Sequence, residues 1–293
     1  MSDIGKLIAE QTRQVEDFKA RKSAEREELS SLSDAAIERV TQDPDAYLHY
    51  LDAQADNPVY SASNVLLALE QRPELSIINS MRGWNAMGRS IISGKTGIKV
   101  FVSEPYFKDG KTLRGYKVAR VFDYADTSGN RTLNKVTLRN DTTQMQMALH
   151  ALLVKSPVKV NPVQDRRLDA YYDPERQVID ISVFLPDNKT FSALAREVFR
   201  AKVHDHGKFM AYTREDTELD AASASYMLCR SFGVPCEKPD TSRLSELYEG
   251  MEPQDARSIL DGIQGAFREL NSAIQRDVAP QQEQRRSYNQ PTR

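Results

Sequence analysis

The sequence has 293 residues, of which 28% are charged and 8% are aromatic, and its formal net charge is -2. This composition is typical of a globular chain with one large domain or two ordinary ones, and it excludes a polycation that binds nucleic acid through its whole surface. No run of 18 apolar residues predicts a membrane span. The start lacks a signal-peptide pattern, and the two cysteines, Cys229 and Cys236, favour reduced thiols, so we expect a cytoplasmic protein with no membrane partner.

Residues 1 to about 56 are predicted to be helical. Ser33-Asp34 can cap a second helix that ends near Val40, and Pro44 opens a third. The block at residues 19–28 carries charges of both signs, which is typical of a helix face in solvent. The first helix has one apolar face, made by residues at helical spacing: Ile4, Leu7, Ile8, Val15 and Phe18.

Asn57-Pro58 ends this helical region, because a residue before proline is pushed out of the helical conformation. Ser61 or Ser63 can cap a short helix, and Pro73 stops it. The only tryptophan, Trp84, follows between glycines. A tryptophan in this setting is more often a core anchor than a platform for a nucleic-acid base, and the sequence leaves both roles open.

Residues 98 to about 140 have strand character. Ile98 to Val102 alternates as a half-buried strand does, and Asp109-Gly110 is a strong signal for a two-residue hairpin turn. Strands at 105–108 and 111–118 flank that turn, and a further strand runs from Ala119 to Tyr124. We therefore expect helices packed on a small, mainly antiparallel sheet.

Local charge favours nucleic acid as a partner of this region. Between Asn57 and Phe122 there are ten Lys or Arg residues and four Asp or Glu residues, a local net charge of +6. Tyr106, Phe107 and Tyr116 lie among these cations. Aromatic rings stack on unpaired bases and cations follow the phosphates of a single strand, although alternating aromatics in a hairpin are also common in a core. The candidate nucleic-acid-binding residues are Arg82, Trp84, Arg89, Lys95, Lys99, Tyr106, Lys108, Lys111, Arg114 and Lys117.

The remaining chain alternates between helices and short strands. Thr142 to Val154 is predicted to be an amphipathic helix, and the polar, proline-containing stretch 155–167 is expected to separate two domains. Residues 170–181 predict a strand, a turn and a strand. Helices are predicted at 191–203, 218–232 and 253–278, and the tail after them is expected to be disordered.

Two stretches resemble a known family. The first is a set of residues at fixed offsets, namely Asn57-Pro58, Tyr60-Ser61, Asn64, Leu66-Leu67, Gln71-Arg72-Pro73, Gly83-Trp84, Gly88-Arg89, Ile91, Gly94 and Gly97-Ile98. The second is Val121-Phe122-Asp123 with Thr127. Together they resemble the N-terminal domain of ArdC-type antirestriction proteins, although Ala125 and Asp126 replace the Ser-Gln usual in that family. The resemblance implies a domain that binds single-stranded DNA for plasmids, phages or related mobile elements.

The order of elements after residue 166 also resembles this family, whose C-terminal half is a zincin-like metallopeptidase fold. Its H-E-x-x-H helix binds zinc through two histidines, uses the Glu as general base, and is completed by an acidic ligand from a later helix. The matching residues here are Arg196-Glu197-Val198-Phe199-Arg200, and the third ligand position falls at Asp220. Arginine offers no lone pair to a metal. The resemblance therefore implies a pseudoenzyme in which Glu197 is vestigial.

An ion-pair cluster is expected in place of the zinc site, with Arg196 and Arg200 able to pair with Glu197 and Asp220 and to hold their two helices in register. A rewired metal site of Glu197, His204 and Asp220 is the alternative. Histidines near a helix C-terminus are, however, also stabilised by the helix dipole without any metal. No cofactor is expected.

We predict an α+β protein of two domains. Its parts are a helical extension (1–45), a single-stranded-DNA-binding-like domain (46–140), a connector (141–165), a zincin-like domain (166–278) and a disordered tail (279–293). The predicted function is non-catalytic binding of single-stranded DNA for a mobile element or phage, with a host defence or other protein as a further partner. Two alternatives stay open: an interaction protein that uses this fold to bind protein partners, and a residual metal-dependent peptidase that uses Glu197.

Overall fold

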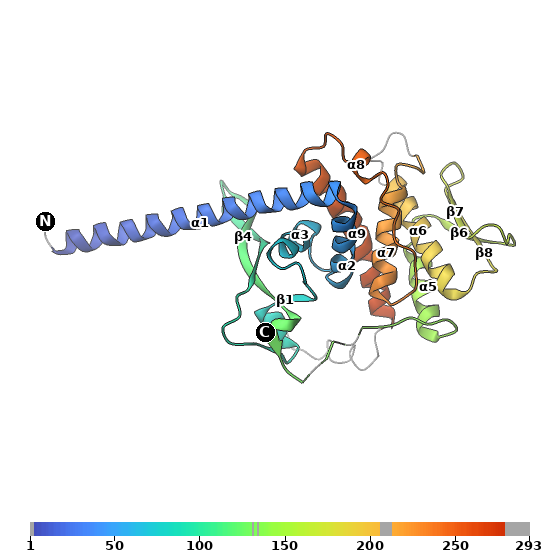
Figure 1. The fold of residues 1–293 in the computed structure, drawn as a ribbon, viewed down its shortest axis with the longest axis horizontal. Coiled ribbons are helices and arrows are strands. Elements are labelled where there is room, and N and C mark those ends of the chain that lie inside the picture. The colour runs from blue at the N-terminus through green and yellow to red at the C-terminus, as the bar shows by residue number, and fades with distance from the viewer. Residues whose placement is uncertain (1–2, 131, 134, 206–212, 279–293) are drawn as a thin grey trace. The chain divides into compact units, whose positions relative to one another are not determined.

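The computed structural model describes residues 3–130, 132–133, 135–205 and 213–278 (Figure 1). Helices and three small sheets give it an α+β fold, as predicted. The chain divides into two compact units: unit 1 comprises residues 1–39 and 66–130, and unit 2 comprises residues 40–65 and 131–293. The boundaries inferred from sequence near residues 45, 140 and 165 stay a prediction. Within the described ranges, none of the helices has the length and apolar character that crossing a membrane requires.

The N-terminal helix is longer than the sequence predicts. α1 runs without interruption from Asp3 to Gln42, so the predicted break at Ser33-Asp34 is wrong. The apolar period continues through that pair, since Leu29 and Ile37 on either side are both buried and Ser33 is buried with them. A serine that lies in a continuous buried stripe does not end a helix by its capping preference alone.

The second helix begins as predicted. α2 (Pro44–Asp56) has proline in its first turn, and the side chain of Asp43 accepts hydrogen bonds from the backbone N–H groups of Asp45 and Ala46. A carboxylate at this position satisfies donors that the helix leaves open. α3 (Ala62–Gln71) follows, and it ends before Pro73 as expected.

Unit 1 contains a long two-stranded ribbon. β3 (Ile98–Lys108) pairs antiparallel with β4 (Lys111–Asp123), and their register joins Lys108 to Lys111 and Ile98 to Val121. The predicted turn is confirmed: Asp109 and Gly110 both have positive φ, at 51° and 76°, as a two-residue hairpin turn requires. The two strands are continuous rather than broken into the shorter pieces expected.

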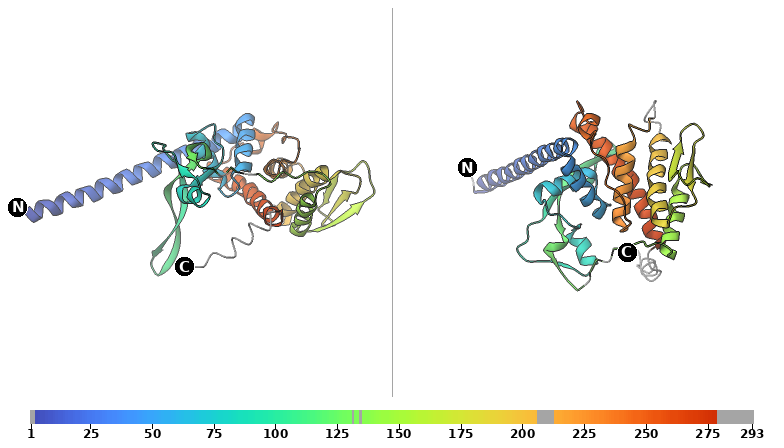
Figure 2. Two further views of the ribbon diagram at one scale, coloured as in Figure 1. Left: turned by 90° about the horizontal axis from the view of Figure 1, so that it is seen from below. Right: turned by 45° about the vertical axis from the view of Figure 1, so that its right-hand side comes forward.

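Short elements close the base of this ribbon. They are β1 (Ile78–Ser80), α4 (Met81–Ala86), β2 (Ser90–Ile91), the 3-10 turn η1 (Tyr124–Asp126) and β5 (Thr127–Ser128). β1 adds to the ribbon beside Val121 to Asp123, which gives the strand order β1-β4-β3, and β2 pairs with β5. Figure 2 shows the ribbon reaching away from these elements to its turn.

Unit 2 is built from helices and one three-stranded sheet. The strands are β6 (Lys159–Val163), β7 (Ala170–Asp173) and β8 (Val178–Ser182); β8 lies in the middle, parallel to β6 and antiparallel to β7. The predicted strand, turn and strand at 170–181 are confirmed. Residues 155–167, expected to separate two domains, contain β6 and are therefore part of this sheet.

Unit 2 contains α2 and five later helices: α5 (Thr143–Lys155), α6 (Asp187–Asp205), α7 (Glu218–Ser231), α8 (Leu244–Leu247) and α9 (Pro253–Val278). α6 lies between the sheet and α7, with α9 beyond α7 (Figure 2). Phe191, Leu194 and Val198 of α6 are buried in this core. The predicted tail at 279–293 lies outside the described residues.

Candidate functional site

Aromatic and basic side chains gather on the ribbon beyond its covered base. Tyr106, Phe107 and Tyr116 have 49%, 74% and 51% of their surface exposed. We define the hairpin surface as these rings together with the three exposed cations of β4 that lie nearest the turn, namely Tyr106, Phe107, Tyr116, Lys111, Arg114 and Lys117. Large exposed rings on a ribbon are a cost unless something covers them.

The register sorts the hairpin surface into two faces. Side chains directly opposite each other across an antiparallel pair lie on the same face, as do residues two apart on one strand. Phe107 is opposite Thr112, Pro105 is opposite Arg114, and Ser103 is opposite Tyr116. Phe107, Arg114 and Tyr116 therefore share one face. Along this face the pair that contains Arg114 lies between the pair that contains Phe107 and the pair that contains Tyr116.

The other face of the ribbon carries Tyr106. Its ring lies over Gly115, because a Cβ placed on that glycine would come within 2.9 Å of the Tyr106 ring. Only glycine leaves room for this close approach. On the same face Lys117 makes an ion pair of 2.5 Å with Glu104, so its charge is partly neutralised within the protein.

Two predicted binding residues are instead structural. Trp84 is fully buried, and its indole N–H donates to the carbonyl of Phe122 at 2.8 Å. Arg89 is buried too, donates to Thr127 and to the carbonyl of Gly129, and lies 4.1 Å from the centre of the Tyr124 ring. Both side chains are buried, so neither belongs to the exposed surface of the ribbon. The core reading of Trp84 is the correct one.

The other predicted cations differ in their contacts with the rest of the protein. Lys95 and Arg72 both make ion pairs with Asp126. Lys99 pairs with Glu25 at 2.9 Å. Arg82 is exposed on α4. The side chain of Lys108 lies outside the described part of the structure.

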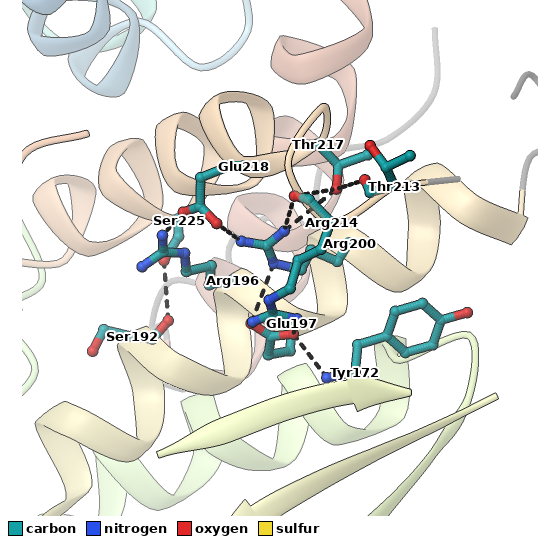
Figure 3. A network of polar contacts seen from close by, with 10 residues as sticks. All are labelled: Tyr172, Ser192, Arg196, Glu197, Arg200, Thr213, Arg214, Thr217, Glu218 and Ser225. Carbon is teal, nitrogen blue, oxygen red and sulfur yellow. Dashed lines mark hydrogen bonds and ion pairs between the residues drawn. The ribbon is translucent and has the colours of Figure 1, made fainter. Parts of the chain in front are cut away.

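Unit 2 holds a cluster of charged side chains between α6 and the start of α7 (Figure 3). Arg196 and Arg200 of α6 both make ion pairs with Glu218 of α7. Arg200 is also 3.3 Å from Glu197. An ion-pair cluster is thus present where the sequence predicts one, but Glu218 takes the place that was assigned to Asp220.

Glu197 is a buried member of the cluster and has several hydrogen-bond donors around it. Arg214, in the segment before α7, donates to both of its oxygens at 2.8 and 3.0 Å, and the backbone N–H of Tyr172 in β7 donates to it at 2.8 Å. The side chain of Arg200 is fully buried beside it and also donates to the carbonyl of Arg214 at 2.9 Å. The role of Arg214 was missed, because it lies 17 residues from Glu197 in a segment without periodic signal.

The electrostatics of the cluster follow from burial. Burial and the neighbouring Arg200 lower the pKa of Arg196. Burial raises the pKa of Asp220 to about 7, since an apolar setting disfavours its charged form. His204 forms a hydrogen bond of 2.6 Å with the hydroxyl of Tyr172. Tyr172 thus lies between His204 and Glu197, because its backbone N–H donates to Glu197.

These residues do not suit a divalent cation. Guanidinium groups cannot donate electron pairs and repel a metal, and three of them, from Arg196, Arg200 and Arg214, meet at Glu197 and Glu218. Across residues 3–205 and 213–278, apart from the two gaps near residue 132, His, Cys, Asp and Glu side chains form no group of three that could hold a metal. The arrangement links α6 to α7 and to the sheet through Glu197 and Glu218.

Comparison with known proteins gives a match at the level of structure. No family model matches the sequence, and none of the curated proteins matches it. The chain is similar to the crystal structure of the metal-free antirestriction protein ArdC from the R388 plasmid, with TM-score 0.57 and 16% identity over 85% of this chain and 98% of that chain. For the Mn(II)-bound structure of ArdC the values are 0.53 and 17% over 86% and 98%. The chain therefore has the ArdC fold.

Proposed function

We propose that this chain is a single-stranded-DNA-binding protein of the antirestriction kind, carried by a plasmid or phage, and that the hairpin surface is its main contact. The observation that carries the proposal is the exposure of Phe107, Arg114 and Tyr116 on one face of a two-stranded ribbon. Rings that accept stacked bases, with a cation between them, are the usual means of holding an unpaired strand without reading its sequence.

The chemistry of this face favours unpaired over paired nucleic acid. Bases in a duplex are stacked on one another, so the rings of Phe107 and Tyr116 would have no free base to cover. In a single strand, a base on each ring leaves the phosphates between them within reach of Arg114. Lys111 lies on the other face, with Tyr106, and adds positive charge near the turn.

We further propose that unit 2 is non-catalytic and has lost a metal site. R388 ArdC has been crystallised with Mn(II), whereas the donor set around Glu197 in this chain is cationic. A general base needs a lone pair that can reach its proton, and both oxygens of Glu197 already accept hydrogen bonds. This engagement argues against a residual peptidase. Stoichiometric manganese or zinc in the purified protein, measured by elemental analysis, would contradict the proposal.

The test of DNA binding is a fluorescence anisotropy titration with a labelled single-stranded oligonucleotide and a duplex of the same sequence. We expect the single strand to bind more tightly, and the logarithm of its affinity to fall linearly with the logarithm of salt concentration. The double variant Phe107→Ala/Tyr116→Ala should lose most of the binding. Lys238→Ala, an exposed position in unit 2, is the matched control.

Two outcomes separate the alternatives. Equal affinity for duplex and single strand would contradict a stacking surface and leave only a general attraction to phosphate. No binding to either, even at low salt, would sink the nucleic-acid proposal and favour a protein partner for the same exposed rings.

A further inference from the structure

The two cysteines of the chain lie close to one another at the end of α7. Cys229 is in the last turn of α7 and is fully buried, and Cys236 in the segment after it is half-buried. The stretch that separates them would span about 23 Å if it were extended. The two side chains can therefore meet only because the chain reverses its direction after α7.

A turn at the end of α7 provides this reversal. Gly233 has a φ of 63°. The backbone N–H of Val234 donates to the carbonyl of Cys229 at 2.9 Å, and the backbone N–H of Gly233 donates to the carbonyl of Arg230 at 3.3 Å. These two bonds are the pair that commonly ends a helix at a glycine in the left-handed conformation. The turn brings Cys236 back to α7, where its thiol and the thiol of Cys229 form a hydrogen bond.

The two thiols differ in access and in charge. The hydrogen bond with Cys236, together with burial, raises the pKa of Cys229. The hydrogen bond from Cys229 and the positive charge of Arg230 lower the pKa of Cys236. Burial and the carboxylate of Asp52 oppose this lowering, but Asp52 is itself engaged by Arg230 at 3.0 Å and by the hydroxyl of Tyr226 at 2.6 Å. Cys236 therefore loses its proton more readily, and the thiolate is the form of cysteine that reacts.

We propose that Cys229 and Cys236 form an oxidation site, at which hydrogen peroxide produces an intramolecular disulfide. Cys236 is the attacking thiol, because it is partly open to solvent and lies near the guanidinium of Arg230. Cys229 is the resolving thiol, because it is fully buried next to Cys236. An accessible, activated cysteine beside a resolving cysteine is the usual arrangement of a redox-sensitive site. The reduced thiols expected from the sequence are the resting state of this pair.

The reaction takes two steps. The thiolate of Cys236 attacks one oxygen of the peroxide, the O–O bond breaks, and the hydroxide that leaves takes up a proton to become water. The sulfur of Cys229 then attacks the sulfenic acid on Cys236, the S–O bond breaks, and the leaving hydroxide takes the proton of Cys229 as a second water. The two thiols together lose two hydrogens and two electrons, and the peroxide is reduced to two waters.

The second step needs little movement of the chain. The two sulfur atoms are already in hydrogen-bond contact and must approach to about 2.05 Å. Residues 234–241 are in neither a helix nor a strand, so the approach of Cys236 disrupts no regular element. The disulfide would link the end of α7 to the segment that follows it, and a thiol reductant would restore the free pair.

The test treats the reduced full chain with hydrogen peroxide and measures its intact mass and its free thiols after denaturation. We expect the protein to lose two hydrogens and both free thiols, to run as a single chain on a non-reducing gel, and to regain both thiols with dithiothreitol. The disulfide should form faster in the folded protein than in urea, because the fold holds the two thiols together. Thiols that survive the treatment, a disulfide that joins two chains, or equal rates in the folded and unfolded protein would overturn the proposal.

Single variants test the order of attack. Cys229→Ala should stop at a sulfenic acid on Cys236, which dimedone labels and peptide mapping locates. Cys236→Ser should leave Cys229 unlabelled over the same time. Labelling of Cys229 in Cys236→Ser as fast as that of Cys236 in Cys229→Ala would overturn the assigned order. Circular dichroism checks that both variants fold, and the result for the wild type does not depend on either.

Arg230→Gln tests the charge beside Cys236. We expect this variant to react with peroxide several-fold more slowly than the wild type, because less of Cys236 is thiolate and the charge of Asp52 is no longer balanced. Arg176→Gln, which removes an exposed arginine that also pairs with aspartates in unit 2, is the matched control and should react at the wild-type rate. Equal rates in all three proteins would overturn the role assigned to Arg230. None of these measurements involves DNA.

Discussion

The guanidinium of Arg214 holds both carboxylate oxygens of Glu197, with Nη2 2.8 Å from Oε1 and Nη1 3.0 Å from Oε2. Because Tyr172 of β7 donates to the same carboxylate, Glu197 ties α6 to the sheet and to the segment before α7. Glu197 thus accepts hydrogen bonds from two different segments of unit 2. The consequences can be measured as stability rather than as activity.

We expect Glu197→Gln to destabilise the protein by about 1.5–3 kcal/mol, because the fully buried Arg200 loses one of its two carboxylate partners and keeps only Glu218. The free energy of unfolding from a urea titration measures this. Arg196→Ala should cost less than about 1 kcal/mol, since its pair with Glu218 is well exposed to solvent. Glu197→Gln with unchanged stability would mean that the cluster does not hold unit 2 together.

The raised pKa of Asp220 predicts a pH effect on stability. The pKa of an aspartate in the unfolded chain is about 3.9, and in the folded protein it is about 7. The folded state therefore binds the extra proton between these values, and stability should fall as pH rises from about 4 through 7. Because Asp220 keeps some exposed surface, we expect a loss of roughly 1–3 kcal/mol rather than the full shift.

Asp220→Asn isolates this effect. The amide cannot ionise, so the variant should be more stable than the wild type at pH 8 and close to it at pH 4.5. Thermal unfolding at the two values of pH provides the comparison. A variant that tracks the wild type at both would show that Asp220 ionises freely in the folded protein.

Burial of Trp84 makes a spectroscopic prediction. It is the only tryptophan in the sequence, so all indole emission reports on this one site. We expect a blue-shifted emission that acrylamide quenches poorly and that an added single-stranded oligonucleotide leaves nearly unchanged. Trp84→Phe keeps an aromatic ring but loses the indole N–H that donates to the carbonyl of Phe122. This variant should cost about 1–3 kcal/mol of stability, because a buried carbonyl loses its donor. Strong quenching by the oligonucleotide would restore Trp84 as a contact residue.

Cationic and aromatic members of the hairpin surface should affect DNA binding in different ways. Arg114→Ala should lower the slope of log affinity against log salt by about 0.7, the value for one phosphate contact on a single strand. Tyr116→Ala should cost about 1–3 kcal/mol at every salt concentration, because stacking does not release counterions. Anisotropy titrations at several salt concentrations distinguish the two. Equal slopes in both variants and the wild type would remove Arg114 from the phosphate path.

Sequence alone determined those elements of this protein that depend on interactions between residues close together in the chain. The turn at Asp109-Gly110 depends on two residues that tolerate positive φ, and the helix at 253–278 depends on apolar periodicity, so both could be predicted with their bounds. The cationic character of Arg196 and Arg200 could also be inferred, because a guanidinium carries its charge and offers no lone pair whatever surrounds it. The apolar face of the first helix could be predicted from the sequence. Its exposure to solvent, from Ile4 to Phe18, could not.

Tertiary structure decided which of several chemically equal residues does which task. Arg89 and Arg114 have the same charge, but one is buried against Tyr124 and the other is exposed on the ribbon. Glu218 and Asp220 are both acidic, but only Glu218 is placed to meet Arg196 and Arg200. These choices depend on the direction and burial of side chains that contacts between distant segments fix, and spacing along the chain does not record them.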